Sequence, residues 1–345
     1  MPVTLKDIAA ICGVHPSTVS RVLRGKENLR VSEEMRHKIF SLAESLNYRP
    51  DQIARALRLK KSNAIGMIIP NISSPYFSGI AKVVDKLCSQ LGYTLVICDT
   101  NENQNKEINA INDFYSRGVD GMIIAPVQES DFHIRDLVEK KFPFVVIDRC
   151  FNDFKTNAVI SNDEECTYHA VTHLANEGHQ VIGFVSSRAN LYPVLKRLDG
   201  YYRALRENGL CDKKELVRIG NHTLKSGYHS MMQLINLSTP PTAIIISGTV
   251  ITLGVVKAIM EQGWSIPKEI SIIGFTDTLF APYLVCAITT VTHQIEKIGK
   301  AAFKLLHKHL DSLKPLAYTQ IVVDMNFNLR ESTQNISVLL EKMGQ

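Results

Sequence analysis

The stretch "VTLKDIAAICGVHPSTVSRVLRGKE", residues 3–27, decides what kind of domain opens this chain. Thr4 is followed three residues later by Asp7, which predicts a capping box at the start of a first helix. Gly13 permits a tight turn after that helix. Pro16 suits the first position of a second helix, where its missing N–H costs nothing. The stretch therefore predicts two short helices joined by a turn.

The apolar residues here and in the segment that follows recur with the 3.6-residue period of helices. They give three short helices one apolar face each, formed by Leu5, Ile8, Ala9 and Cys12, by Val19, Val22 and Leu23, and by Met35, Ile39, Leu42, Ala43 and Leu46. Ser32 is the predicted cap of the third helix. The second helix presents small polar groups and arginines to solvent, which is the layout of a helix-turn-helix that enters the DNA major groove. The pattern alone leaves a plain helical hairpin with an exposed basic face as the alternative.

Basic charge is concentrated at the same end of the chain. Residues 1–62 contain twelve Lys/Arg and six Asp/Glu, a net charge of +6. The whole chain of 345 residues has 39 against 34, so the remainder has 27 against 28, a net charge of −1. This asymmetry indicates a polyanion-binding head on a nearly neutral body. A solvated basic tail is the alternative, but such a tail would lack the apolar periodicity.

The motifs of the N-terminal part resemble those of the lactose-repressor (LacI) family of bacterial transcription regulators. The matching residues are T-L-K-D-I-A-x-x-x-G-V-x-x-x-T-V-S-R-V-L, then L-N-Y-R-P-D-x-x-A-R-A-L, and the similarity continues through nearly the whole chain. The resemblance implies a repressor that binds a palindromic operator in double-stranded DNA as a homodimer and controls carbohydrate-catabolism genes. The DNA-contacting residues that it implies are Thr4, Leu5, His15, Pro16, Ser17, Thr18, Ser20, Arg21, Arg24, Tyr48, Ala54, Arg55 and Leu57.

Three of these residues carry most of the expected sequence readout. Arg21 can donate two hydrogen bonds to a guanine edge. Pro16 and Ser17 occupy the two positions that most often set sequence choice in the family; a proline there can make only an apolar contact, for example with a thymine methyl group. His15 stands where the family commonly has Ser or Thr, and either contacts a phosphate or caps the helix.

Residues 51–62 are expected to form a hinge between a head at 1–50 and a core at 63–330. A helix of two turns is marginal in water by itself, so this segment needs a partner helix, DNA or both. The resemblance implies that Leu57, supported by Ala54, wedges into the central minor groove when two protomers pair, and that effector binding shifts the order of the hinge. An ordinary basic linker is the alternative.

The core is predicted to be α/β, with two doubly wound parallel subdomains of the periplasmic-binding-protein type. Short apolar runs alternate with amphipathic stretches in two blocks, which we place at about 63–157 and 158–289, with crossing segments at about 290–330. The tail at 331–345 is too short for a sustained heptad zipper, so we expect a dimer through the body. A ligand would sit at the carboxyl ends of the strands, between the two halves.

No enzyme, cofactor or metal site is predicted. Motifs such as G-x-S-x-G, H-E-x-x-H and G-x-x-x-x-G-K-[ST] are missing from the sequence. His169 and His173 share a helical face, but a solvated helix explains that spacing. The seven scattered cysteines are typical of reduced thiols, and without a secretory signal or membrane span we expect a cytoplasmic protein.

The effector is expected to contact residues at the strand ends. The candidates are Tyr76, Phe77, Asp148, Arg149, Arg197, His222, Gly248, Thr276 and His293. Arg197 corresponds to the arginine that holds ligand hydroxyls or a carboxylate in the family. An interdomain salt bridge between Asp148 and Arg197 is an equally good explanation of these two residues.

Three departures from the family pattern bear on the effector. "TAIIISGTV" has Gly248 and Thr249 in place of an Asn-Asp pair, and "GFTDT" has Thr276 in place of an Asp. Asn162 and Asp163 stand where the family has an Asp-Asn pair. Losing carboxylates while keeping Arg149, Arg197 and neighbouring cations favours an anionic effector, such as a sugar acid or sugar phosphate, over a neutral sugar. The alternatives are a degenerate pocket or control by a protein corepressor, and, less favoured, a sugar-binding protein that does not bind DNA.

Overall fold

The computed structural model describes residues 3–23, 31–48, 61–151, 153–277, 281–283, 286–312 and 316–336. The chain divides into two compact units, a head at residues 1–62 and a body at residues 63–345. Each is described by itself below.

The head is built from three helices, α1 (Leu5–Cys12), α2 (Pro16–Val22) and α3 (Glu33–Ser45). The predicted capping box is present: the backbone N–H of Thr4 donates to Asp7 Oδ2 at 2.8 Å, and that of Asp7 donates to Thr4 Oγ1 at 3.4 Å. Gly13 ends α1 with φ of 65°, a conformation that glycine adopts without strain. The buried side chains of the head come from all three helices: Ile8, Ala9, Cys12, Val19, Val22, Ile39 and Ala43. The three apolar faces predicted from the sequence thus form one small core.

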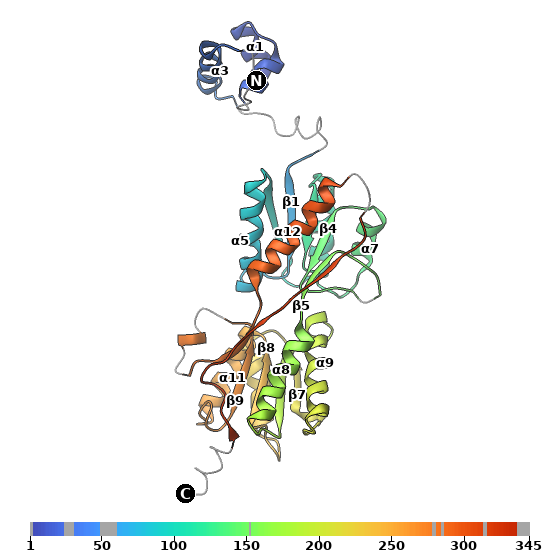
Figure 1. The fold of residues 1–345 in the computed structure, drawn as a ribbon, viewed down its shortest axis with the longest axis vertical. Coiled ribbons are helices and arrows are strands. Elements are labelled where there is room, and N and C mark those ends of the chain that lie inside the picture. Colours follow the sequence, from blue (N-terminus) through green and yellow to red (C-terminus); the bar gives the residue numbers. More distant parts are fainter. Residues whose placement is uncertain are drawn as a thin grey trace. The chain divides into compact units, whose positions relative to one another are not determined.

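The body contains two lobes, each built on a six-stranded sheet (Figure 1). In the first lobe the strand order is β11-β5-β4-β3-β1-β2, and every pairing is parallel. Its strands are β1 (Ala64–Ile69), β2 (Thr94–Asp99), β3 (Gly121–Ile124), β4 (Phe144–Ile147), β5 (Ala158–Ser161) and β11 (Gln320–Val323). The inner strands are apolar on both faces, as expected for a parallel sheet covered on both sides.

Four helices cover the first sheet, two on each face. Side chains of β1 point to both faces of the sheet. Ile65, Met67 and Ile69 pack on the face covered by α5 (Pro75–Gln90) and α12 (Ile295–Asp311), whereas Ile68 packs on the opposite face. That opposite side is covered by α6 (Gln104–Ser116) and α7 (Phe132–Glu139). Figure 1 shows α5 and α12 side by side over the same face.

The second lobe repeats this plan with one reversed strand. Its order is β12-β10-β9-β8-β6-β7, and β12 pairs with β10 antiparallel while the other pairings are parallel. Its strands are β6 (Ile182–Ser187), β7 (Val217–Gly220), β8 (Ala243–Ser247), β9 (Ser271–Phe275), β10 (Thr289–Thr292) and β12 (Asn326–Asn328). The helices α8 (Asp163–Asn176) and α9 (Tyr192–Glu207) cover one face, and α10 (Leu224–Ile235) and α11 (Thr249–Glu261) cover the other.

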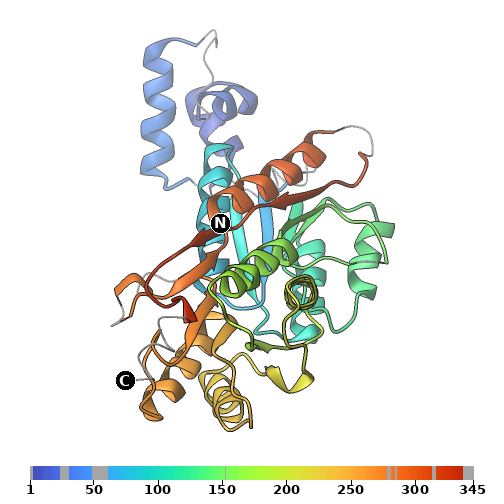
Figure 2. The ribbon, with the colours of Figure 1, turned by 60° about the horizontal axis from the view of Figure 1, so that its bottom comes forward.

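The predicted fold class is confirmed, but the structure places two segments differently from the sequence-based boundaries. Residues 158–161, expected to open the second subdomain, form β5 and pair with β4 in the first sheet. Residues 320–328, expected only as a crossing segment, contribute a strand to each sheet. Local pattern identifies a buried strand but does not say which sheet it joins, and these two edge strands are too short and too exposed for their pattern to be recognised. Figure 2 shows the red segment that contains them running from one lobe to the other.

Among the residues described, no helix combines the length and the apolar character needed to cross a bilayer. The seven cysteines all lie within the described residues and are free thiols, as predicted.

His179 contacts the segment that follows β12, residues 329–336, and this contact makes the free energy of unfolding depend on pH. The ring is fully buried, with Nδ1 2.9 Å from Thr242 Oγ1 and Nε2 3.2 Å from the carbonyl oxygen of Gln334. Burial lowers the pKa of His179 to about 4. An imidazole with a depressed folded-state pKa contributes stability that is present above its unfolded value of 6.5 and is lost as pH falls towards 4.

We therefore predict that His179→Gln lowers the free energy of unfolding at neutral pH and flattens its decline between pH 6.5 and 4. The change in slope is at most about 1.4 kcal/mol per pH unit, the effect of one proton. Urea unfolding across this pH range measures it. His169→Gln, which alters an exposed histidine of α8, is the matched control. Parallel pH profiles for wild type and His179→Gln would contradict the prediction.

Candidate nucleic-acid interface and effector site

His15 caps the second helix of the head. Its Nδ1 accepts the backbone N–H of Ser17 at 3.3 Å and lies 2.8 Å from Ser17 Oγ. Pro16 follows in the first helical position, as predicted. Of the two roles that the sequence left open for His15, capping is the one seen in the structure. The cap satisfies a backbone N–H that the first turn of the helix would otherwise leave unpaired.

The helix α2 turns a small polar face to solvent. Ser17 and Arg21 lie one helical turn apart and are exposed, whereas Val19 and Val22 point into the head core. The remaining predicted DNA contacts differ in exposure: Thr4 and His15 are exposed, and Leu5, Pro16, Thr18, Ser20 and Tyr48 are half-buried. The predicted contacts Arg24, Ala54, Arg55 and Leu57, and with them most of the expected hinge, lie outside the described residues.

In the body, polar side chains gather where the carboxyl ends of the strands of both sheets meet. We call this group the polar cluster; it consists of Tyr76, Glu102, Asp148, Arg149, Ser161, Asp163, Arg188, Arg197, Ser247 and His293. Ligands of open α/β sheets bind at this end of the strands because successive strand ends converge there. The cluster is therefore the candidate effector site.

Arg197 of α9 is the most highly connected member of the cluster. Its Nε donates to Asp163 Oδ1 at 2.7 Å, and its Nη1 donates to Ser247 Oγ at 2.9 Å. Its guanidinium carbon lies 4.5 Å from the centre of the Phe275 ring. Burial raises the pKa of Asp163 to about 6, although the charge of Arg197 acts in the opposite direction. The pairing considered from sequence, Asp148 with Arg197, is not the one formed; Asp163 takes that place.

His293 links the lobes as a neutral imidazole. Its Nδ1 lies 2.9 Å from Ser161 Oγ, and Nη2 of Arg197 donates to its Nε2 at 3.4 Å. Since arginine can only donate, Nε2 is the unprotonated nitrogen and Nδ1 carries the hydrogen. Burial and the charge of Arg197 lower the pKa of His293 to about 3, so the ring stays neutral at physiological pH. The Tyr76 ring contacts it at a centroid distance of 4.6 Å.

Asp148 is surrounded by buried groups whose hydrogen bonds are unmade. The hydroxyl of Tyr76 and Nε of Arg149 are buried and have no hydrogen-bond partner among the described residues. Nε of Arg149 lies 3.6 Å from Asp148 Oδ2, beyond hydrogen-bond length, and the charge of Asp148 contributes to raising the pKa of Tyr76 after the larger effect of burial. Asp148 itself is held at φ of 67°, an uncommon conformation for a residue with a side chain. The Nε of Arg149 and the hydroxyl of Tyr76 thus both lie near Asp148 without a hydrogen bond of normal geometry.

Glu102 joins two arginines at the other end of the cluster. It receives two hydrogen bonds from Arg149, at 2.6 and 3.0 Å, and one from Arg188 of the second lobe at 3.0 Å. Arg149 also donates to the carbonyl oxygen of Pro126 at 2.8 Å. Burial opposes ionisation of Glu102, but the hydrogen bond and charge of Arg149 prevail and lower its pKa.

The other predicted effector residues lie around this cluster. Phe77 is buried in the core of the first lobe and meets Tyr76 edge to face at 4.9 Å. His222 is exposed and lies against Gly248, where an added Cβ would come within 2.9 Å of its ring. Thr276 is half-buried just after β9. The aspartate that follows it, Asp277, is held by Arg330 at 2.6 Å.

Five members of the polar cluster were not among the predicted site residues: Glu102, Ser161, Asp163, Arg188 and Ser247. Arg188 was expected only as one of the cations near the strand ends. Asp163 follows a strand in an "SND" stretch that departs from the family pattern, and nothing in the sequence assigns its carboxylate a partner. Ser161 and Ser247 end strands, and that position is the only sequence signal they carry. Glu102 lies in the polar loop "TNENQN", and nothing in the sequence says that this loop reaches two arginines from different parts of the chain.

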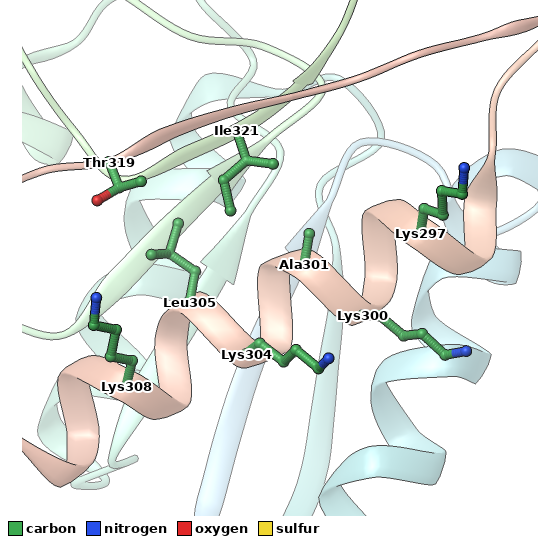
Figure 3. Close-up of a pocket in the computed structure, with 8 residues that line it drawn as sticks. All are labelled: Lys297, Lys300, Ala301, Lys304, Leu305, Lys308, Thr319 and Ile321. Atoms are coloured by element: carbon green, nitrogen blue, oxygen red, sulfur yellow. The ribbon is translucent and has the colours of Figure 1, made fainter.

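A hollow of about 470 Å³ lies on the first lobe between α12 and β11. Figure 3 shows four lysines along one side of α12: Lys297, Lys300, Lys304 and Lys308. The apolar lining of the hollow comes from Ala301, Leu305 and Ile321. Nζ of Lys300 lies 2.6 Å from Glu296 Oε1. We call this the basic groove.

Within the described part of the chain, no group of three or more His, Cys, Asp or Glu side chains is arranged to hold a metal ion.

Comparison with known proteins agrees with this architecture. Residues 4–51 match the model for bacterial regulatory proteins of the lacI family, and residues 171–333 match that for a periplasmic binding protein-like domain. Catabolite control protein A of Priestia megaterium is 30% identical over 90% of this chain and 93% of its own length. An HTH-type transcriptional repressor PurR, from Glaesserella parasuis serovar 5, is 31% identical over 88% of both chains. The lac repressor dimer bound to operator and an anti-inducer superposes with a TM-score of 0.85 at 25% identity, covering 97% of this chain and all of that one.

Head, body and polar cluster together define a DNA-binding transcriptional regulator with a ligand-binding body. The chain belongs to the lacI family of bacterial regulatory proteins, as its motifs predicted.

The buried pair in the polar cluster can be tested by its effect on stability. Arg197→Met leaves Asp163 buried without its cation, so we expect a loss of about 3–5 kcal/mol in the free energy of unfolding. Combining it with Asp163→Asn removes the orphaned charge and should restore most of that loss. Urea unfolding of the single and double variants measures both effects. Equal destabilisation in the two variants would show that the pairing is not what Arg197 contributes.

Proposed function

We propose that this protein is a dimeric repressor of carbohydrate-catabolism genes, whose head binds a palindromic operator and whose polar cluster binds the effector. The observation that carries the proposal is the pair of features in one chain: an exposed Ser17–Arg21 face on a capped α2, and a buried cluster with unmade hydrogen bonds between two lobes. Its DNA target places the protein in the cytoplasm.

In this proposal α2 lies in the major groove. Arg21 donates to a guanine edge, and Ser17, one turn earlier, contacts the neighbouring base. Pro16 offers only an apolar surface, which suits a thymine methyl group. His15 orients the helix through its cap, so its contribution to DNA binding is indirect.

The remaining predicted DNA contacts are assigned by resemblance. Thr4, Leu5, Thr18, Ser20 and Tyr48 are proposed to contact or support contacts to the operator backbone and bases. Arg24, Ala54, Arg55 and Leu57 keep the roles expected from the sequence. Leu57 wedges into the minor groove, Ala54 supports it, Arg55 lies near phosphates, and Arg24 is a further DNA contact.

An exposed apolar edge supports assembly into a homodimer. The strand β2 is one edge of the first sheet, and its Val96 and Ile97 are 40% and 42% exposed. Leu91, which precedes that strand, is 54% exposed. An edge strand with exposed apolar side chains is normally covered by a partner. Two copies paired through the body would present two heads to half-sites about one DNA turn apart.

The charge balance of the polar cluster favours a neutral, polyhydroxylated effector such as a sugar. Its three arginines already face three carboxylates: Arg149, Arg188 and Arg197 against Glu102, Asp148 and Asp163. An anionic ligand would add a negative charge without an unpaired guanidinium to receive it, which weakens the sequence-based argument for a sugar acid or phosphate. Hydroxyl groups both donate and accept, so adjacent hydroxyls would satisfy Asp148, the Tyr76 hydroxyl and Arg149 Nε together.

Control by a protein corepressor is the second candidate, and the basic groove is the observation in its favour. The first and last of the groove's four lysines are 11 residue steps apart on α12, about 16 Å, which is too far for one small anion to bridge. An acidic protein surface would match this length and the apolar lining. The ordinary explanation of such a row is a solvated helix face.

The readout role of Arg21 yields a prediction. After selection of the preferred duplex from a random library, Arg21→Ala should lose about 1–3 kcal/mol of specific affinity and bind random duplex nearly as before. Lys38→Ala, an exposed basic residue of α3, is the matched control and should weaken both only slightly. Fluorescence anisotropy at fixed salt measures the two affinities. Equal losses in both variants, or no selectable duplex, would refute the proposed readout.

A second prediction concerns the effector. In calorimetry against neutral sugars and matching sugar acids and phosphates, we expect heat of binding from a neutral member. Asp148→Asn should weaken that binding by about 1–3 kcal/mol, because a charged hydrogen-bond partner is lost. Binding of anions alone would refute the neutral-effector assignment, and no binding at all would favour the corepressor or a degenerate pocket.

A further inference from the structure

The two lobes are fastened to each other at one end of their sheets by the segments that cross between them. Nδ2 of Asn162 donates to Asp324 Oδ1 at 3.0 Å, and Nε2 of Gln294 donates to the carbonyl oxygen of Asp324 at 2.8 Å. The backbone N–H of Met325 donates to Asn162 Oδ1 at 2.9 Å. These residues follow β5, β10 and β11, which lie at or next to one edge of each sheet. We call this edge, where the chain passes between the lobes, the crossover edge of the body.

A second set of contacts joins the lobes at the opposite edges. Glu102 follows β2, the other edge strand of the first sheet, and Arg188 follows β6, which neighbours the other edge strand of the second sheet. Nη1 of Arg188 donates to Glu102 Oε2 at 3.0 Å, and its Nη2 lies 3.5 Å from Glu129 Oε1. Nearby, the backbone N–H of Tyr192 donates to Gln128 Oε1 across the same junction at 2.9 Å.

Both partners of the Glu102–Arg188 pair are held in place within their own lobes. Glu102 is clamped by two hydrogen bonds from the buried Arg149, and the backbone N–H of Arg188 donates to the carbonyl oxygen of Gly220 at 3.0 Å. Glu102 has φ of 55° and Arg188 has φ of 35°, left-handed conformations that side-chain-bearing residues seldom adopt. Such backbone conformations persist where the surrounding structure enforces them. The backbones of Glu102 and Arg188 are therefore held in the positions that bring their side chains together.

The half-buried Asp148 and the buried Arg197 and His293 belong to the same polar cluster as the Glu102–Arg188 pair. We propose that Glu102 and Arg188 form a latch that holds the two lobes closed before any effector binds. Glu102 is also a positioning residue for the site, because the carboxylate that receives Arg188 is the one that fixes Arg149 beside Asp148. The effect of this latch on effector binding rests on the proposed function. The closure of the lobes by the Glu102–Arg188 pair does not rest on it.

The latch shifts the equilibrium between open and closed lobes towards the closed form, but it does not lock the lobes closed. Glu102 is 34% exposed and Arg188 is 23% exposed in their side chains, so water and salt screen the pair in part. An ion pair of this kind shifts an open–closed equilibrium several-fold, which is enough for a ligand to compete with it. A ligand that reaches the cluster does so through the open form, and its apparent affinity is reduced by the fraction of closed protein.

Hydrogen–deuterium exchange of the full-length protein without effector tests the latch. The reporter is the peptide that carries the Tyr192 amide, whose partner lies in the other lobe. We expect Arg188→Gln and Glu102→Gln each to speed exchange there by about threefold or more. Lys140→Gln, which breaks the ion pair with Asp136 inside the first lobe, is the matched control and should leave the reporter unchanged. Amides of β8, inside the second sheet, report that each variant is folded.

Salt separates a latch from a merely structural contact. Raising the salt concentration from about 0.05 to about 1 M, where the Debye length falls to about 3 Å, should speed reporter exchange in wild type towards that of Arg188→Gln. The variant itself should respond little. Reporter exchange that is the same in Arg188→Gln and wild type, or a salt response that is equal in both, would overturn the proposal. Neither outcome depends on whether the protein binds DNA or an effector.

Discussion

A buried guanidinium must be paired, and the pairing of Arg197 with Asp163 organises the centre of this molecule. Arg197 comes from a helix of the second lobe, yet its guanidinium also reaches His293, which bonds Ser161 at the end of a strand of the first sheet. The His293–Ser161 contact is the step in this chain of contacts that crosses from the second lobe to the first, at the carboxyl ends of both sheets. The geometry of the lobes and the chemistry of the candidate site are therefore parts of one constraint.

The same constraint explains why the site is polar and electrically balanced and can still bind a ligand. Three arginines and three carboxylates balance within the polar cluster, so the lobes can meet without a large electrostatic penalty. The groups left over, around Asp148, are hydrogen-bonding positions rather than unpaired charges. A polyhydroxylated ligand would complete them and add contacts across the junction, which is how occupancy could be transmitted to the hinge segments of a regulator in this family.

Much of this could be predicted from the sequence because it rests on local rules. The capping box at Thr4, the turn at Gly13 and the proline at the start of α2 follow from short-range chemistry, and the alternating runs of the body identify its plan of two α/β blocks. What could not be predicted depends on pairing across long separations. Asp163 rather than Asp148 takes Arg197, 34 residues away, and Glu102 meets Arg188 at a separation of 86. No periodicity or motif encodes those distances, and edge strands such as β11 and β12 are recognised only once their neighbours are known.

The central claim is that occupancy of the polar cluster in the body controls operator binding by the head. The most direct measurement is an anisotropy titration of the selected operator with full-length protein, with and without a saturating amount of the neutral sugar that raises the melting temperature most. The account predicts that the operator Kd changes by about fivefold or more, the size of an ordinary allosteric coupling. An operator Kd that is the same at saturation as without the sugar would contradict it.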